Sequence, residues 1–79
     1  MTRAEISSRV IKICKHKSYI VDMQIFECTD LRNDMGLDSL DLQNLLFDIE
    51  VEFGVTITEK ELSSLNTIGD VVEEVYKKL

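Results

Sequence analysis

The sequence predicts an all-α, four-helix bundle with three main helices, one short helix and a long loop between helices one and two. Three capping motifs divide the chain, and apolar residues recur at helical spacing after them. Proline is absent and glycine occurs at only three positions, whereas many-turned β structure needs more turn residues. A length of 79 residues accommodates one domain, residues 1–79.

The first helix is predicted to run from about Arg3 to about Lys17. Thr2 and Glu5 form a capping box, in which each side chain accepts a hydrogen bond from the backbone of the other residue. The apolar residues that follow at helical spacing are Ile6, Val10 and Ile13. Cys14 falls within this pattern, so we expect it to be a small core residue.

Residues 18–37 show no sustained period and predict a long loop, which is uncommon in a compact domain and often functional. The apolar residues expected to pin this loop to the core are Ile20, Ile25 and Leu31. Cys28 lies in the loop and is expected to be partly exposed. Two cysteines are too few for a disulfide framework or a metal site, so a reducing cytoplasm is the simplest compartment.

The second helix is predicted to start at Asp38 and to run to about Phe53, with Gly54 directly after its end. A short extended piece, residues 55–57, follows. A second capping box, Thr58 with Glu61, opens a short third helix that carries Leu62 and extends at most to Leu65.

The fourth helix opens at the third capping motif, Thr67 with Asp70. Its apolar residues form one stripe at helical spacing: Ile68, Val71, Val72, Val75, Tyr76 and Leu79. A single stripe predicts that this helix packs on the core along one face.

The second helix differs because it carries two apolar faces. At about 100° per residue, the core face consists of Leu42, Leu45, Leu46, Ile49 and Phe53. The opposite face consists of Leu40, Phe47 and Val51, and acids flank it at Asp41, Asp48 and Glu52. An exposed apolar ridge edged by carboxylates suits docking to a groove with a basic rim. The alternative is that the first helix or the long loop covers Leu40 and Phe47 permanently.

Ser39 falls in the first turn of this helix, between Asp38 and Asp41. Two interpretations are open: a serine that another protein modifies, or a simple helix cap formed by Asp38 or Ser39. A catalytic serine would need an oriented imidazole, and the single histidine, His16, lies at the end of the first helix. We therefore predict no catalytic residue and no enzyme.

Residues 30–41 place acids with a spacing that invites comparison with a calcium-binding loop. They depart from that pattern at Arg32, Met35 and Asp41, so no metal site is predicted.

The charge of the chain is unevenly distributed. The net charge is −6, but residues 1–20 sum to +4 and residues 21–79 to −10. Phosphates of nucleic acids and anionic lipids would repel the acidic part, whereas basic protein surfaces would attract it. No apolar run is long enough to cross a bilayer, so we expect no membrane insertion. The acidic charge predicts no binding to nucleic acid, and a monomer is expected.

Four segments in order carry a resemblance to one family. Residues 34–40, D-M-G-L-D-S-L, resemble the D-L-G-x-D-S-L segment of acyl carrier proteins, which holds their 4′-phosphopantetheine attachment serine. The other three segments are residues 25–31, 49–57 and 66–71. The resemblance covers nearly the whole chain and is weakest at residues 18–24.

The resemblance implies a mechanism. A phosphopantetheinyl transferase would move 4′-phosphopantetheine from coenzyme A to Ser39, and the arm's thiol would then carry acyl groups as thioesters. Acyl-transfer, ketosynthase or other acyl-processing enzymes with basic docking surfaces would contact Asp38, Leu40, Asp41, Phe47, Asp48, Val51 and Glu52. An acyl chain could lie among Leu45, Leu46, Ile49, Ile57, Leu62 and Ile68. Fatty acid biosynthesis is the pathway that the resemblance favours.

Four positions depart from the family pattern: Tyr19 where glycine is common, Asn44 for a glutamate, Phe47 for an aliphatic residue or methionine, and Val51 for an acid. A specialised carrier for a polyketide, special-lipid or aminoacyl pathway is therefore an alternative. An alternative of another class is a small helical interaction module without a prosthetic group.

Overall fold

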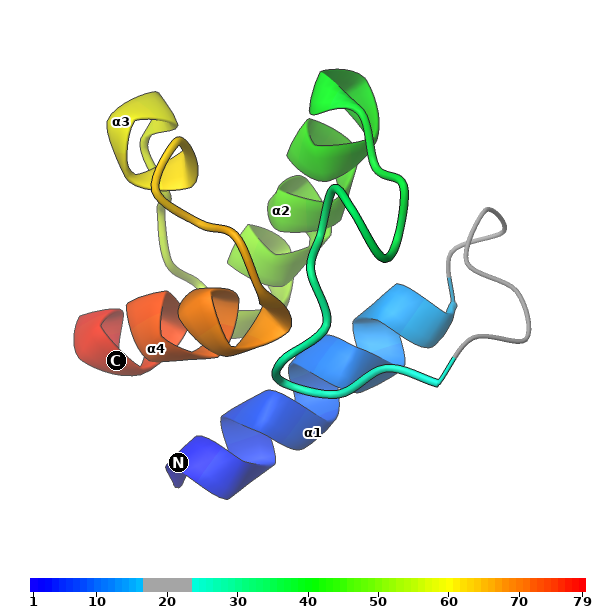
Figure 1. Ribbon diagram of the computed structural model, residues 1–79. Helices are drawn as coiled ribbons and strands as arrows, with labels where there is room; N and C mark the ends of the chain where they lie inside the picture. The colour runs from blue at the N-terminus through cyan, green and yellow to red at the C-terminus, as the bar shows by residue number, and fades with distance from the viewer. Residues whose placement is uncertain (17–23) are drawn as a thin grey trace.

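The computed structural model describes residues 1–16 and 24–79 and contains four helices (Figure 1). They are α1 (Arg3–Lys15), α2 (Ser39–Phe53), α3 (Glu59–Leu62) and α4 (Ile68–Lys78). Within the described residues the only β contact is an isolated antiparallel bridge between Asp30 and Thr67. The predicted all-α, four-helix architecture is confirmed. The first helix ends at Lys15, with His16 as its C-cap, two residues before the predicted end near Lys17. The expectations for Tyr19 and Ile20 lie outside the described residues.

Local capping determines where the helices start. All three predicted capping boxes form, at Thr2, Thr58 and Thr67. The second helix begins one residue later than predicted because Asp38 is its N-cap rather than its first residue. It ends, as predicted, at Phe53, and Gly54 follows with a left-handed φ of 67°, which suits glycine.

The short helix α3 ends at Leu62, three residues before the furthest end predicted. The hydroxyls of Ser63 and Ser64 donate to the carbonyl oxygens of Lys60 and Glu61, at 2.7 and 2.8 Å. These bonds satisfy carbonyls at the helix end without continuing the helix. The chain then turns inward, and Leu65 is buried. Residues 55–57, expected to be extended, form no strand.

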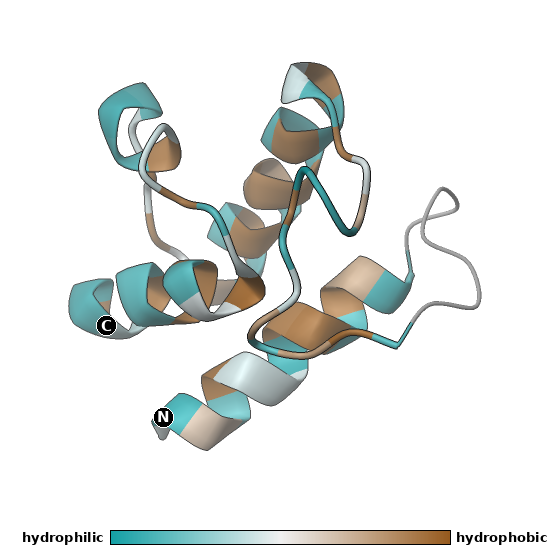
Figure 2. Cartoon of the chain, viewed as in Figure 1, coloured by the Kyte–Doolittle hydropathy of each residue, from teal (hydrophilic) through white to brown (hydrophobic). Residues whose placement is uncertain are grey.

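One apolar core joins the helices, and α1 packs against both α4 and α2. Figure 2 shows hydrophobic stretches on each long helix beside hydrophilic ones, as expected of helices that bury one side. Cys14 lies in this core and Cys28 is exposed, in agreement with the predictions. Ile25 and Leu31 are buried, so they pin the described part of the long loop as expected.

Backbone hydrogen bonds hold the loop against the start of α4. The amide of Leu31 donates to the carbonyl of Asn66 at 2.8 Å, and the amide of Gly69 donates to the carbonyl of Glu27 at 2.8 Å. A Cβ atom at Gly69 would lie 3.2 Å from that same carbonyl oxygen, so glycine permits the close approach.

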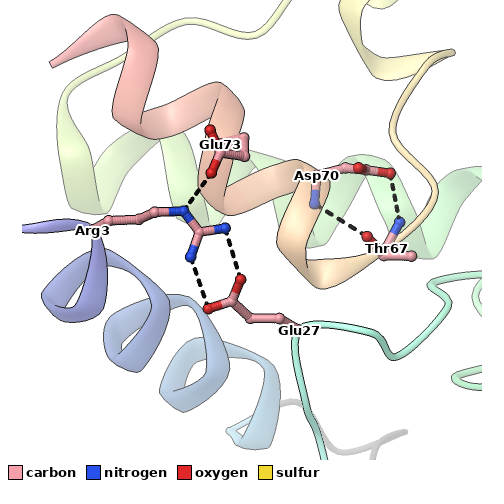
Figure 3. Close-up of polar contacts among 5 residues, drawn as sticks. All are labelled: Arg3, Glu27, Thr67, Asp70 and Glu73. Atoms are coloured by element: carbon pink, nitrogen blue, oxygen red, sulfur yellow. Dashed lines mark hydrogen bonds and ion pairs between the residues drawn. The ribbon is translucent and has the colours of Figure 1, made fainter.

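Arg3 ties α1 to the loop and to α4. Its guanidinium donates to both Glu27 carboxylate oxygens, at 3.0 and 2.7 Å, and to the carboxylate of Glu73 (Figure 3). These bonds hold the pKa of Glu27 below its ordinary value, chiefly through the hydrogen bond from Arg3. Arg3 therefore holds the loop at Glu27, ahead of the segment that leads to α2.

Candidate functional site

Ser39 is the first residue of α2, and its side chain is exposed. The capping role at this helix belongs to its neighbour: the Asp38 carboxylate accepts a hydrogen bond from the backbone N–H of Asp41 at 2.8 Å. Of the two capping candidates weighed from the sequence, Asp38 is the one that caps. The Ser39 hydroxyl is thus displayed at the helix start without being needed for the cap.

A fixed turn sets the position of this helix start. One Asp30 carboxylate oxygen accepts from the backbone N–H groups of Arg32 and Asn33, at 2.9 and 2.8 Å. The Asp34 carboxylate accepts from the N–H of Asp30 at 2.8 Å. The bond from the Asn33 backbone is the largest cause that lowers the pKa of Asp30. Gly36 adopts a left-handed φ of 68°, which lets the chain bend into α2.

Buried side chains anchor the same turn from below. Met35 and Leu37 lie in the core, on either side of Gly36, and the amide of Leu37 donates to the carbonyl of Leu31 at 3.2 Å. Polar and apolar contacts of the residues before Ser39 therefore hold the start of α2 against the core.

A cavity of about 350 Å³ opens beside Ser39, between α2 and α3. Its lining mixes apolar and polar side chains: Arg32, Ser39, Leu42, Gln43, Glu59, Leu62 and Ser63. A cavity lined by an exposed hydroxyl and by apolar and polar side chains can accommodate part of a flexible chain esterified to that hydroxyl.

Of the residues predicted to contact an acyl chain, one lines the cavity beside Ser39 and the others lie in or against the core. Leu62 lines the cavity beside Ser39, whereas Ile57 is half-buried against the core. The remaining four, Leu45, Leu46, Ile49 and Ile68, are buried core residues. Sequence reasoning did not select Arg32, Leu42 or Gln43 for this site; the position of Leu42 directly below Ser39 on the helix was the available signal.

The outward face of α2 is exposed, as one of the two sequence interpretations required. Leu40 is 66%, Phe47 62% and Val51 68% exposed. Neither the first helix nor the described part of the loop covers Leu40 or Phe47, so the alternative of permanent cover by these residues is wrong. Asn44, one of the departures from the family pattern, is also exposed on α2.

The acids that flank this face also make contacts within the chain. Glu52 pairs with Arg9 of α1 at 3.1 Å. Asp41 and Asp48 are half-buried and have interaction partners of their own. The acid edge is therefore partly a structural feature, and only part of its charge is available to a partner.

His16 lines a different cavity, of about 440 Å³, together with Arg9, Lys12, Ile13 and Glu52. The structure thus places the histidine and Ser39 in separate surroundings. Among the described residues, no group of three or more His, Cys, Asp or Glu side chains has a geometry that could hold a metal ion. No described helix is both long and apolar enough to cross a membrane.

Comparisons with known proteins agree on one family. The family described as "Phosphopantetheine attachment site" matches residues 19–75. An acyl carrier protein of Thermotoga maritima is 41% identical over 78 residues, covering 99% of this chain and 96% of the relative. An acyl carrier protein of Saccharopolyspora erythraea is 38% identical over 73 residues, covering 92% and 77%.

The fold agrees as well. The crystal structure of an acyl carrier protein from Thermotoga maritima at 2.00 Å superposes with a TM-score of 0.80 and 25% sequence identity, covering 96% of this chain and 88% of that one. The chain therefore belongs to the acyl carrier protein family: it is a carrier rather than an enzyme, and it works through covalently attached 4′-phosphopantetheine.

Proposed function

We propose that Ser39 is the residue that carries the 4′-phosphopantetheine arm. The observation that supports this most directly is the division of roles at the start of α2, where Asp38 caps the helix and Ser39 stays exposed. Ser39 lies within the matched residues 19–75, and the cavity beside it offers space for the first part of an arm.

The attachment is a phosphoryl transfer. The Ser39 oxygen forms a bond to the phosphorus next to pantetheine in coenzyme A, and the pyrophosphate bond breaks to release adenosine 3′,5′-bisphosphate. The transferase accepts the serine proton. The attached arm supplies a thiol that holds acyl groups as thioesters.

Partner enzymes are proposed to dock on the outward face of α2. Leu40, Phe47 and Val51 supply exposed apolar surface, and Asp38, Asp41, Asp48 and Glu52 supply negative charge around it. Such a surface matches an apolar groove with a basic rim. An acyl chain is proposed to enter through the cavity lined by Leu62, and to displace the apolar side chains of Leu45, Leu46, Ile49, Ile57 and Ile68 behind it.

The pathway proposed is fatty acid biosynthesis in the cytoplasm, where the exposed thiol of Cys28 would stay reduced. The specialised polyketide, special-lipid or aminoacyl pathway is the second candidate, because the apolar Phe47 and Val51 are both exposed on the docking face. Loading the holo chain with acyl groups by enzymes from each kind of pathway separates the two.

Intact mass tests the attachment. With coenzyme A and a phosphopantetheinyl transferase, the wild type should gain one phosphopantetheine and Ser39→Ala should gain none. Ser63→Ala is the matched control, because Ser63 is an exposed serine that lines the same cavity. A mass gain in Ser39→Ala, or no gain in the wild type with several transferases, would contradict the proposal.

A further inference from the structure

The cavity beside Ser39 is lined by one charged side chain of each sign. Among the seven described residues that line it, Arg32 carries the only positive charge and Glu59 the only negative one. Arg32 lies in the long loop, outside α2 and α3, and the attachment chemistry at Ser39 does not require it. A cation beside Ser39 that the attachment does not require suggests a role in binding an anion.

Arg32 is held in place at both ends. Its backbone N–H donates to the Asp30 carboxylate at 2.9 Å, and its Nη1 donates to the carbonyl oxygen of Leu65 at 3.0 Å. A guanidinium has five N–H donors, so one bond to a carbonyl leaves donors for an anion. A side chain already positioned loses less conformational entropy when it binds that anion.

The chemistry of the arm matches the lining. Counting outward from the Ser39 oxygen, the arm presents first a negatively charged phosphodiester, next a carbon with two methyl groups, and then a hydroxyl and amides. The cavity offers a cation in Arg32, apolar surface chiefly in the half-buried Leu62, and polar side chains in Gln43 and Ser63; Leu42 also lines it but is only 2% exposed. Groups of each required kind therefore lie within reach of the esterified serine.

The phosphodiester also enters an acidic neighbourhood. Asp38 and Asp41 flank Ser39 in sequence, and Glu59 lines the cavity. A further negative charge there is repelled unless a cation offsets it. The planar fork of an arginine suits phosphate oxygens better than a lysine does.

We propose that Arg32 is a positioning residue that binds the phosphodiester of the arm in the cavity beside Ser39, with the dimethyl carbon of the arm against Leu62. This inference rests on the proposed attachment at Ser39. It assigns the loop before α2 a direct part in holding the arm.

The test compares apo and holo chains by NMR, after intact mass has verified the loading. The chain has three arginines, so the side-chain Nε–H signals can be assigned. Loading should shift the Arg32 Nε–H signal and leave that of Arg9, which lines the other cavity, unchanged. This measurement needs no variant and is independent of any effect on folding.

The variants use the ³¹P signal of the holo chain. In Arg32→Gln the signal should move and narrow toward that of free phosphopantetheine, Arg32→Lys should restore part of the difference, and Arg9→Gln should match the wild type. An unchanged Arg32 Nε–H signal on loading, or identical ³¹P signals in the wild type and Arg32→Gln, overturns the role of Arg32 alone. No mass gain in the wild type overturns the attachment itself.

Discussion

The two faces of α2 have similar composition and opposite surroundings. On the inward face, Leu42 and Ile49 are at most 2% exposed, whereas Leu40 and Val51 on the outward face are 66% and 68% exposed. The helix contributes to the core with one face and presents apolar surface to solvent with the other. Since one face contacts the core and the other contacts solvent, substitutions on the inward face should change stability and substitutions on the outward face should change partner binding.

The largest effect should come from the inward face. Ile49→Ala removes a fully buried side chain and should lower the free energy of unfolding by about 2–5 kcal/mol, measured by urea denaturation. The matched control is Val51→Ala, two residues later on the outward face, which should change stability by no more than about 0.5 kcal/mol. Equal losses would show that the faces are not separate.

The end of α2 should be the next most sensitive. Gly54→Ala places a Cβ atom at a left-handed φ of 67° and should cost about 1 kcal/mol in the free energy of unfolding. No neighbouring atom lies within 4 Å of that Cβ, so the cost is conformational rather than steric crowding. Gly54→Asn should lose less, because asparagine tolerates this conformation. Equal denaturation midpoints for all three chains would contradict this.

A partly exposed ion pair should contribute less to the free energy of unfolding, and in a pH-dependent way. Glu61 accepts from Lys78 at 2.8 Å, and this bond is the largest cause that lowers the pKa of Glu61, from 4.5 to about 2. A lowered folded-state pKa gives stability that is present above about 4.5 and lost as the pH falls toward about 2. Glu61→Gln should therefore be less stable than the wild type at pH 7.

The pH series sharpens that prediction. The difference in melting temperature between Glu61→Gln and the wild type should shrink as the pH falls from about 4.5 to about 2. Glu59→Gln, a change at the exposed first residue of α3, is the control. If the difference in melting temperature does not depend on pH, the glutamine at position 61 lowers stability by weakening the capping box with Thr58 and not by removing the ion pair.

The smallest effect on stability should come from the outward face. Phe47→Ala should change the free energy of unfolding by no more than about 0.5 kcal/mol, because Phe47 is 62% exposed. Binding of the holo chain to a partner enzyme should weaken by about fivefold or more, as for an apolar residue at the centre of an interface. A loss of about 3–5 kcal/mol in stability, typical of a buried phenylalanine, would contradict the separation of the faces.

Local signals in the sequence predicted the helices well. The capping boxes at Thr2, Thr58 and Thr67 depend on residues three apart, so they can be recognised without a tertiary structure. Helical spacing likewise separated the buried Ile49 from the exposed Phe47. The end of α3 was harder, because it depends on where Leu65 finds the core.

Features that join distant parts of the chain could not be predicted in this way. The bonds from Arg3 reach Glu27 and Glu73, which lie 24 and 70 residues further along. The cavity beside Ser39 depends on how α3 packs near α2, so Arg32 carried no signal in an aperiodic loop. Helical spacing identified the apolar residues predicted to contact an acyl chain. Whether each of them lies in the core or lines the cavity depends on how the helices pack.

The exposed Cys28 has a practical consequence for work on the holo chain. The arm ends in a thiol, so a holo chain presents two accessible sulfur nucleophiles, one on the cargo arm and one on the protein. Maleimide probes, cross-linkers or cargo analogues aimed at the arm will also label the loop unless Cys28 is changed to serine. The buried Cys14 can remain, since its position in the core shields it from such reagents.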